Sequence, residues 1–105
     1  MVISLSVVPI GAGTELREHL AEVLRVIDES GLPYRLNAMS TEIEGEWDEV
    51  MAVVKAAHEA GRRPGGRVVT HIVIDDREGA TGRLEGKVAD VEQVLGKSLG
   101  RPKKT

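Results

Sequence analysis

The side chains of this chain that could form a binding site lie between residues 34 and 47. Here apolar and polar residues alternate on both sides of a short break at Ser40. This period of two is typical of β-strands with one buried face, so we predict a β-hairpin. The polar face of the hairpin would carry an amide, a thioether and two carboxylates, from Asn37, Met39, Glu42 and Glu44. Hydrogen-bonding groups beside an apolar Met side chain indicate the wall of a pocket.

Catalysis by these residues has little support. Glu42 and Glu44 share one strand face and could form an acid–base pair, favour a cationic ligand or be solvated charges. The sequence predicts no nucleophile or metal cluster beside them. His71 could act as a ligand or a base, but a histidine on a strand more often packs or lies at an interface. The chain has no Cys, which excludes disulfides, thiolate metal sites and a Cys nucleophile.

The elements that position the hairpin follow from the apolar periodicities. The first strand starts at Val2 and is expected to end before Pro9, and Thr14 is a plausible N-cap of the helix that follows. Helical stripes then alternate with strands along the rest of the chain. The expected elements are strand 2–8, helix 16–27, the hairpin, helix 47–57, strand 68–76 and helix 84–95.

This order of elements predicts an α+β fold, a ferredoxin-like βαββαβ sandwich with an added C-terminal helix. Right-handed crossovers place the first two helices on one face of a four-stranded antiparallel sheet. Residues 1–97 would form a single domain, and residues 98–105 a basic flexible tail. The other sheet face would be bare and would mix valines with polar groups. Such a face suits two sheets that pack together in a dimer, with clefts at the rim of the interface.

Composition excludes several classes of protein. The chain has 105 residues, of which 41% are hydrophobic and 30% charged, and this argues against disorder. Its formal net charge of −3 makes nucleic acid an improbable partner. An RNA-binding use of the fold would also need aromatic residues on the central strands. No apolar run is long enough to span a membrane, and no leader pattern is visible, so we expect a cytoplasmic protein.

Five segments give the chain a resemblance to a known family. They are Ser6 to Gly11 (SVVPIG), Ser30 to Tyr34 (SGLPY), Met39 to Gly45 (MSTEIEG), Trp47 to Val50 (WDEV) and Arg67 to Arg77. In this order and over nearly the whole length, the chain resembles the small thiamine-binding protein family. That family often has Pro at position 37 and Gly at position 40, where this chain has Asn37 and Ser40.

The resemblance implies binding of thiamine, or of its hydroxymethyl-pyrimidine part, without chemistry, and no other cofactor. It also implies a homo-oligomer, usually a tetramer built from sheet-to-sheet dimers. The residues it implies as ligand-facing are Ser6, Thr14, Asn37, Met39, Thr41, Glu44 and Trp47. Trp47 could instead pack where its helix begins.

The residue chemistry suits such a ligand. Asn37, Ser6 and Glu44 could pair with an aminopyrimidine, and Met39 offers an apolar surface to a flat ring. The carboxylates favour the cationic thiazolium, so we expect free thiamine to bind better than its diphosphate. Two alternatives remain: a self-associating module without a small ligand, and a ferredoxin-like enzyme that acts on a thiamine-like compound.

Overall fold

The computed structural model describes residues 1–11, 13–14 and 16–100. Ala12 and Glu15, and residues 101–105 of the expected basic tail, lie outside the described residues. The elements in chain order are β1 (Val2–Ile10), α1 (Leu16–Glu29), β2 (Tyr34–Leu36), β3 (Thr41–Glu44), α2 (Trp47–Arg62), β4 (Arg67–Asp75) and α3 (Arg83–Leu95). The helix α1 begins at Leu16, and Glu15, which lies between it and the expected N-cap Thr14, is outside the described residues.

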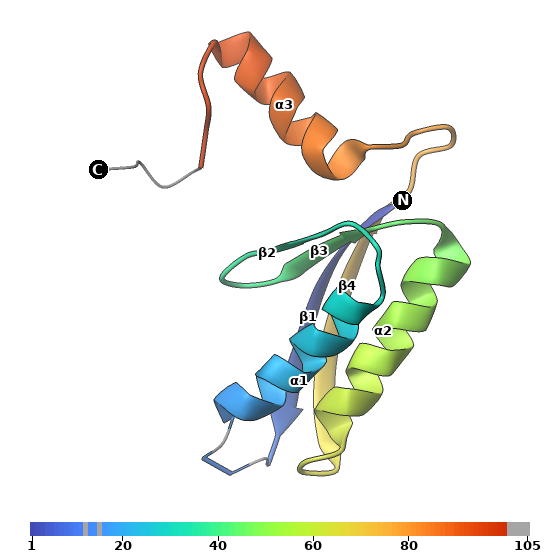
Figure 1. Cartoon of the computed structure of the whole chain (residues 1–105), viewed down its shortest axis with the longest axis vertical. Coiled ribbons are helices and arrows are strands. Elements are labelled where there is room, and N and C mark those ends of the chain that lie inside the picture. Colours follow the sequence, from blue (N-terminus) through green and yellow to red (C-terminus); the bar gives the residue numbers. More distant parts are fainter. Residues whose placement is uncertain (12, 15, 101–105) are drawn as a thin grey trace.

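The four strands form an antiparallel sheet in the order β2-β3-β1-β4. Figure 1 shows α1 and α2 next to each other on one face of this sheet, with α3 set apart beyond its end. The arrangement confirms the predicted ferredoxin-like fold with an additional C-terminal helix.

The core lies between the sheet and the helices α1 and α2. Its members are the apolar residues at alternate strand positions and along the two helical stripes: Ile3, Leu5, Val7, Val23, Ile27, Ile43, Val50, Val53, Val54, Ala57 and Ala60. The intervening strand residues point to the side that α1 and α2 do not cover, here called the open face. The open face comprises Val2, Ser4, Ser6, Val8, Arg35, Glu42, Glu44, Val69, His71, Val73 and Asp75.

The strands differ in length, and this matters for the site. β1 pairs with β4 from Val2 to Ile10, but with β3 only from Val2 to Leu5. The prediction that β1 ends before Pro9 is wrong, because Pro9 is paired with Val68 inside the strand. Beyond Leu5, β1 has one unpaired edge, and proline is tolerated at such an edge because its nitrogen has no hydrogen to donate.

The helix α3 contacts the rest of the protein mainly through its first turns. Leu84 is buried, whereas Val91, Val94 and Leu95 in the later turns are exposed. Figure 1 shows α3 rising away from the sheet from its first turn onward. The helix ends as predicted at Gly96, which adopts a left-handed conformation with φ of 74°. Among the described helices, we find none with the length and hydropathy needed to cross a bilayer.

Candidate functional site

A groove of about 360 Å³ lies between α1, β1 and the β2–β3 hairpin. Its floor is apolar and comes from the helix-covered side of the sheet and from α1: Leu5, Val7, Leu20, Val23, Leu24 and Ile27. The hairpin and β1 supply its rim, which includes Ser6, Asn37 and Met39, whereas Thr41 is buried on the same sheet face as Leu5. An apolar floor with a few polar groups at the rim is the usual composition of a small-molecule site.

The groove exists because β3 is shorter than β1. Within the described residues, β1 has no strand beside it on the β3 side from Ser6 onward. Alternate residues of a strand direct their N–H and C=O groups to the same edge, so some of these groups in β1 point toward the groove. A ligand could therefore hydrogen-bond to main chain as well as to side chains. The hairpin closes through a hydrogen bond of 2.9 Å from the Asn37 N–H to the Ser40 carbonyl oxygen.

Four of the seven residues predicted to face a ligand meet at this groove. Thr41 is only 5% exposed, whereas Met39 is 87% exposed at the hairpin turn and is available to cover a ligand. Asn37 donates a hydrogen bond of 2.7 Å from Nδ2 to Oε1 of Glu42. Ser6 lies on β1 just past the last residue that pairs with β3.

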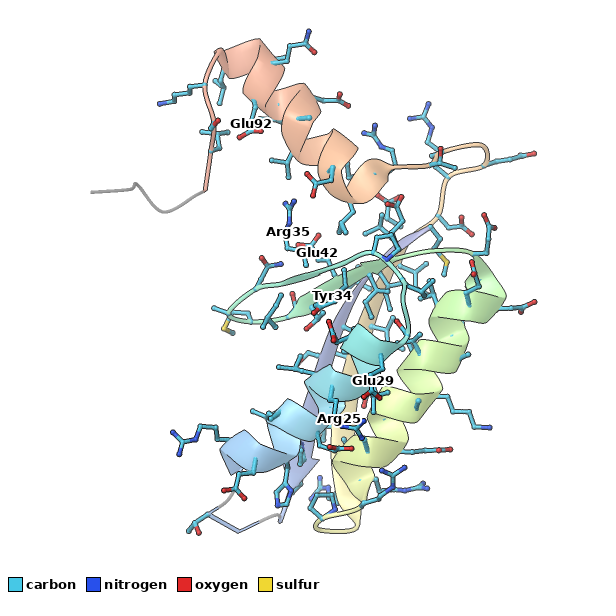
Figure 2. All side chains as sticks on the ribbon, in the orientation of Figure 1. Arg25, Glu29, Tyr34, Arg35, Glu42 and Glu92 are labelled. Atoms are coloured by element: carbon cyan, nitrogen blue, oxygen red, sulfur yellow. The ribbon has the colours of Figure 1, made fainter. Side chains whose placement is uncertain are left out.

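Polar contacts at the start of β2 hold the hairpin against α1. The Tyr34 hydroxyl donates a hydrogen bond of 2.6 Å to Oδ1 of Asp28, and this bond raises the pKa of Tyr34. Hydrogen bonds to Glu22 and Glu29 likewise raise the pKa of Arg25 on the same helix. Figure 2 shows Arg25 and Glu29 on α1, and Tyr34 at the start of β2. The contact between Tyr34 and Asp28 therefore connects β2 to α1, although neither residue lines the groove.

Glu44 lies outside the groove and caps α3. Its Oε2 accepts a hydrogen bond of 2.7 Å from the Arg83 N–H, and its Oε1 one of 3.5 Å from the Leu84 N–H. The residue before the helix is Gly82, which has no side chain to offer as a cap. Glu44 therefore does for α3 what an N-cap side chain does elsewhere. The expectation that Glu44 faces the ligand finds no support in this geometry.

The remaining predicted residues are also apart from the groove. Trp47 is 52% exposed at the start of α2, where it lines a separate hollow with Arg77 and Ala80 and not the groove. Thr14 is exposed in the turn before α1. His71 is exposed on the open face. No group of three or more His, Cys, Asp or Glu suited to a metal ion occurs among the described residues.

Two features of the groove were not predicted. Leu20 and Leu24 were assigned to the core stripe of α1 alone, but they also form the groove floor. The signal that could have revealed this is the brevity of the segment between Ser40 and Gly45, which is too short to pair with all of β1. Glu42 was expected on the polar face of the hairpin as a carboxylate that could favour a cationic ligand, but its hydrogen bond with Asn37 at the rim was not predicted.

Comparison with known proteins gives one family. A family model described as thiamine-binding protein matches residues 3–92. A UPF0045 protein of Mycobacterium bovis is 44% identical over 96 residues, which cover 90% of this chain and 94% of that protein. A UPF0045 protein of Synechocystis is 36% identical over 96 residues, with 90% and 79% of the two chains covered.

Solved structures agree with this result. The hypothetical protein MJ1052 of Methanocaldococcus jannaschii superposes with a TM-score of 0.78 at 28% identity, over 88% of this chain and 95% of that chain. A protein of Thermotoga maritima, which its name assigns provisionally to thiamine biosynthesis or salvage, superposes with a TM-score of 0.75 at 28% identity. That match covers 86% of this chain and 96% of the other.

Proposed function

Because the chain belongs to the thiamine-binding protein family, we propose that it binds thiamine, or the hydroxymethyl-pyrimidine part of thiamine, in the groove beside the hairpin. Binding would serve salvage, storage or delivery of the vitamin, without chemical conversion. The observation that carries the proposal is the groove itself, where an apolar floor meets a polar rim at the unpaired edge of β1.

The chemistry of the groove suits a flat heterocycle. Its volume of about 360 Å³ lies at the lower end of the range of roughly 300–1,000 Å³ typical of small-molecule sites. The apolar floor would pack against a ring, and Met39 at the turn could cover the exposed side of that ring. Ser6, Asn37 and the edge of β1 would supply the donors and acceptors that an aminopyrimidine needs.

A thermal-unfolding titration tests this function. Thiamine, hydroxymethyl-pyrimidine and thiamine diphosphate would be added separately to the wild-type protein. A ligand that binds only the folded state stabilises it by about 2.7 kcal/mol at a hundredfold excess over its dissociation constant. We expect a concentration-dependent rise in Tm with thiamine and less with the diphosphate. No shift with any of the three compounds would refute the proposal, and conversion of thiamine to a product would refute its non-catalytic part.

A pair of serine variants locates the ligand. Ser6 lies at the groove, whereas Ser4 lies two residues earlier, where β1 is paired on both sides. Ser6→Ala removes one hydrogen-bonding group and should weaken thiamine binding about two- to thirteenfold, the range for a net contribution of about 0.5–1.5 kcal/mol. Ser4→Ala is the matched control and should bind as the wild type does. Equal affinities of the two variants would place the ligand elsewhere.

The open face supports a second candidate function, a self-associating module without a small ligand. Val8 and Val73 on this face are 40% and 68% exposed, and Val69 lies opposite Val8. Two such faces packed together would form a sheet-to-sheet dimer, and a dimer of dimers would give the tetramer that the family resemblance implies. Val73→Lys should shift the molar mass measured by light scattering toward the monomer. A wild-type protein that is monomeric at micromolar concentration would refute self-association.

A further inference from the structure

The open face carries three carboxylates close to the groove and α3, and two of them already have partners. Glu44 accepts hydrogen bonds from the first N–H groups of α3. Asp75 forms an ion pair with Lys87 of the same helix. In the described part of the chain Glu42 has no ion-pair partner, and it accepts a hydrogen bond from Asn37, a neutral group.

Asn37 connects this third carboxylate to the groove. An ionised carboxylate can only accept, so the amide nitrogen of Asn37 faces Glu42 and the amide oxygen is turned away. Asn37 itself lines the groove. A ligand in the groove would therefore contact a residue, Asn37, that is hydrogen-bonded through its amide nitrogen to the carboxylate of Glu42. This pair suits a heterocycle that donates hydrogen bonds and carries a positive charge.

Arg35 is the cation that would be expected to neutralise Glu42. The two residues are directly opposite each other in the antiparallel β2–β3 pair, on the same face, and opposite charges in this position ordinarily attract. The Arg35 guanidinium instead forms an ion pair of 2.7 Å with Glu85 of α3. Figure 2 shows Arg35 and Glu42 together on the hairpin, on the side that faces α3. Glu85 thus competes with Glu42 for the same guanidinium.

We propose that Glu42 is the residue that makes the groove prefer a cationic ligand, and that Glu85 acts as a positioning residue by keeping Arg35 away from Glu42. The proposal rests on the proposed function, since it names the residue that discriminates among ligands of the same groove. It assigns α3 a role in ligand binding although α3 does not line the groove.

The test measures the affinities of thiamine, which carries a positive charge, and of neutral hydroxymethyl-pyrimidine by calorimetry. Exposed ion pairs contribute up to about 1 kcal/mol, which corresponds to about fivefold in affinity. Glu42→Gln should therefore weaken thiamine binding about fivefold and change hydroxymethyl-pyrimidine binding less than about twofold. Glu59→Gln on α2 makes the same change in net charge outside the groove and should leave both affinities unchanged.

The role of Glu85 is tested by rescue. Glu85→Gln releases Arg35 to pair with Glu42, and we expect about threefold weaker thiamine binding, since an exposed pair must be broken before the cation binds. The double variant Arg35→Gln/Glu85→Gln removes the competing cation and should regain at least wild-type affinity. Asp90→Asn is the matched control on α3, because it removes the ion pair with Arg83 and does not touch Arg35.

The outcomes separate this proposal from the proposed function. If the wild-type protein binds neither compound, the function is wrong. If it binds thiamine but Glu42→Gln keeps the same preference for thiamine over hydroxymethyl-pyrimidine, Glu42 does not select the charge. If Glu85→Gln weakens binding and the double variant does not restore it, α3 acts by another route and the positioning role is refuted. If Glu85→Gln binds as the wild type does, that role is also refuted.

Discussion

Replacement of Glu44 by alanine should release α3 from the sheet while the rest of the fold stays intact. Glu44 accepts hydrogen bonds from the Arg83 and Leu84 N–H groups at the start of α3. Loss of an N-cap costs about 1 kcal/mol, and loss of a negative charge at a helix N-terminus about 0.3–1 kcal/mol more. The expected total is about 1.5 kcal/mol.

This loss should be local because α3 adds little to the core. Leu84 is the buried residue of α3, and it does not belong to the main core cluster. Hydrogen exchange of the α3 amides is therefore the appropriate assay, because elements with few buried contacts open without global unfolding. A cost of about 1.5 kcal/mol predicts roughly tenfold faster exchange in α3, with unchanged exchange in α2.

Two further variants complete the experiment. Glu44→Gln keeps an accepting oxygen but loses the charge, so its exchange rates should lie between those of the wild type and Glu44→Ala. Glu78→Gln in the loop before α3 is a control for net charge. If Glu44→Ala leaves the exchange of α3 unchanged and abolishes thiamine binding, then Glu44 contacts the ligand and does not stabilise the N-terminus of α3.

Three other perturbations follow from the structure. Ile43→Ala removes a side chain that is fully buried between the sheet and the helices and should lower the free energy of unfolding by about 2–5 kcal/mol, measured with urea. Gly65→Ala would place a Cβ 2.3 Å from the carbonyl oxygen of Ile10, so the main chain must move. We expect the free energy of unfolding to fall by about 1–3 kcal/mol, and an unchanged Tm would contradict this. The chain has one Tyr, so Asp28→Asn should lower the pKa of Tyr34 toward its ordinary value in an ultraviolet titration. Because the pKa of Tyr34 is raised in the folded state, this contact stabilises the protein below the ordinary pKa of tyrosine, and the stabilisation is lost as the pH rises through the raised value. An ultraviolet titration that Asp28→Asn leaves unchanged would contradict the contact.

The fold was predictable because the apolar periodicity and the positions of Gly and Pro indicate the same helices and strands. Apolar residues recur with a period of two in the strands and near 3.6 in the helices, and Gly31 and Pro33 separate α1 from the hairpin. The faces assigned to Ile43 and Glu42 were also correct, since Ile43 is buried and Glu42 is on the open face, whereas Asn37 and Met39 lie beyond the end of β2. These are local properties, and local patterns determine them.

The groove depends instead on relations between distant elements. Sequence periodicity does not give the number of residues over which two strands pair, and the groove results from the pairing of β3 with only the first part of β1. The role of Glu44 was hidden for the same reason, because its partners follow it by 39 and 40 residues. Trp47 was expected to face the ligand or to pack where its helix begins, and its place in a hollow apart from the groove likewise depends on distant residues such as Arg77.

Ligand binding and the docking of α3 should be linked through the same four-residue strand. Thr41 lines the groove, Glu42 faces its rim and Glu44 holds α3, all within β3. If Glu85 raises the affinity for thiamine about threefold by holding Arg35, then thiamine must favour the docked α3 by the same factor, because coupling between two equilibria is reciprocal.

This reciprocity gives a last prediction. Saturation with thiamine should slow hydrogen exchange of the α3 amides about threefold, although α3 does not line the groove. Neutral hydroxymethyl-pyrimidine should leave the exchange of α3 unchanged, because it does not compete with Arg35 for Glu42. In Arg35→Gln the effect of thiamine on α3 should vanish, since the shared cation is gone. Equal protection of α3 by both compounds would mean that the hairpin and α3 communicate through packing and not through Arg35.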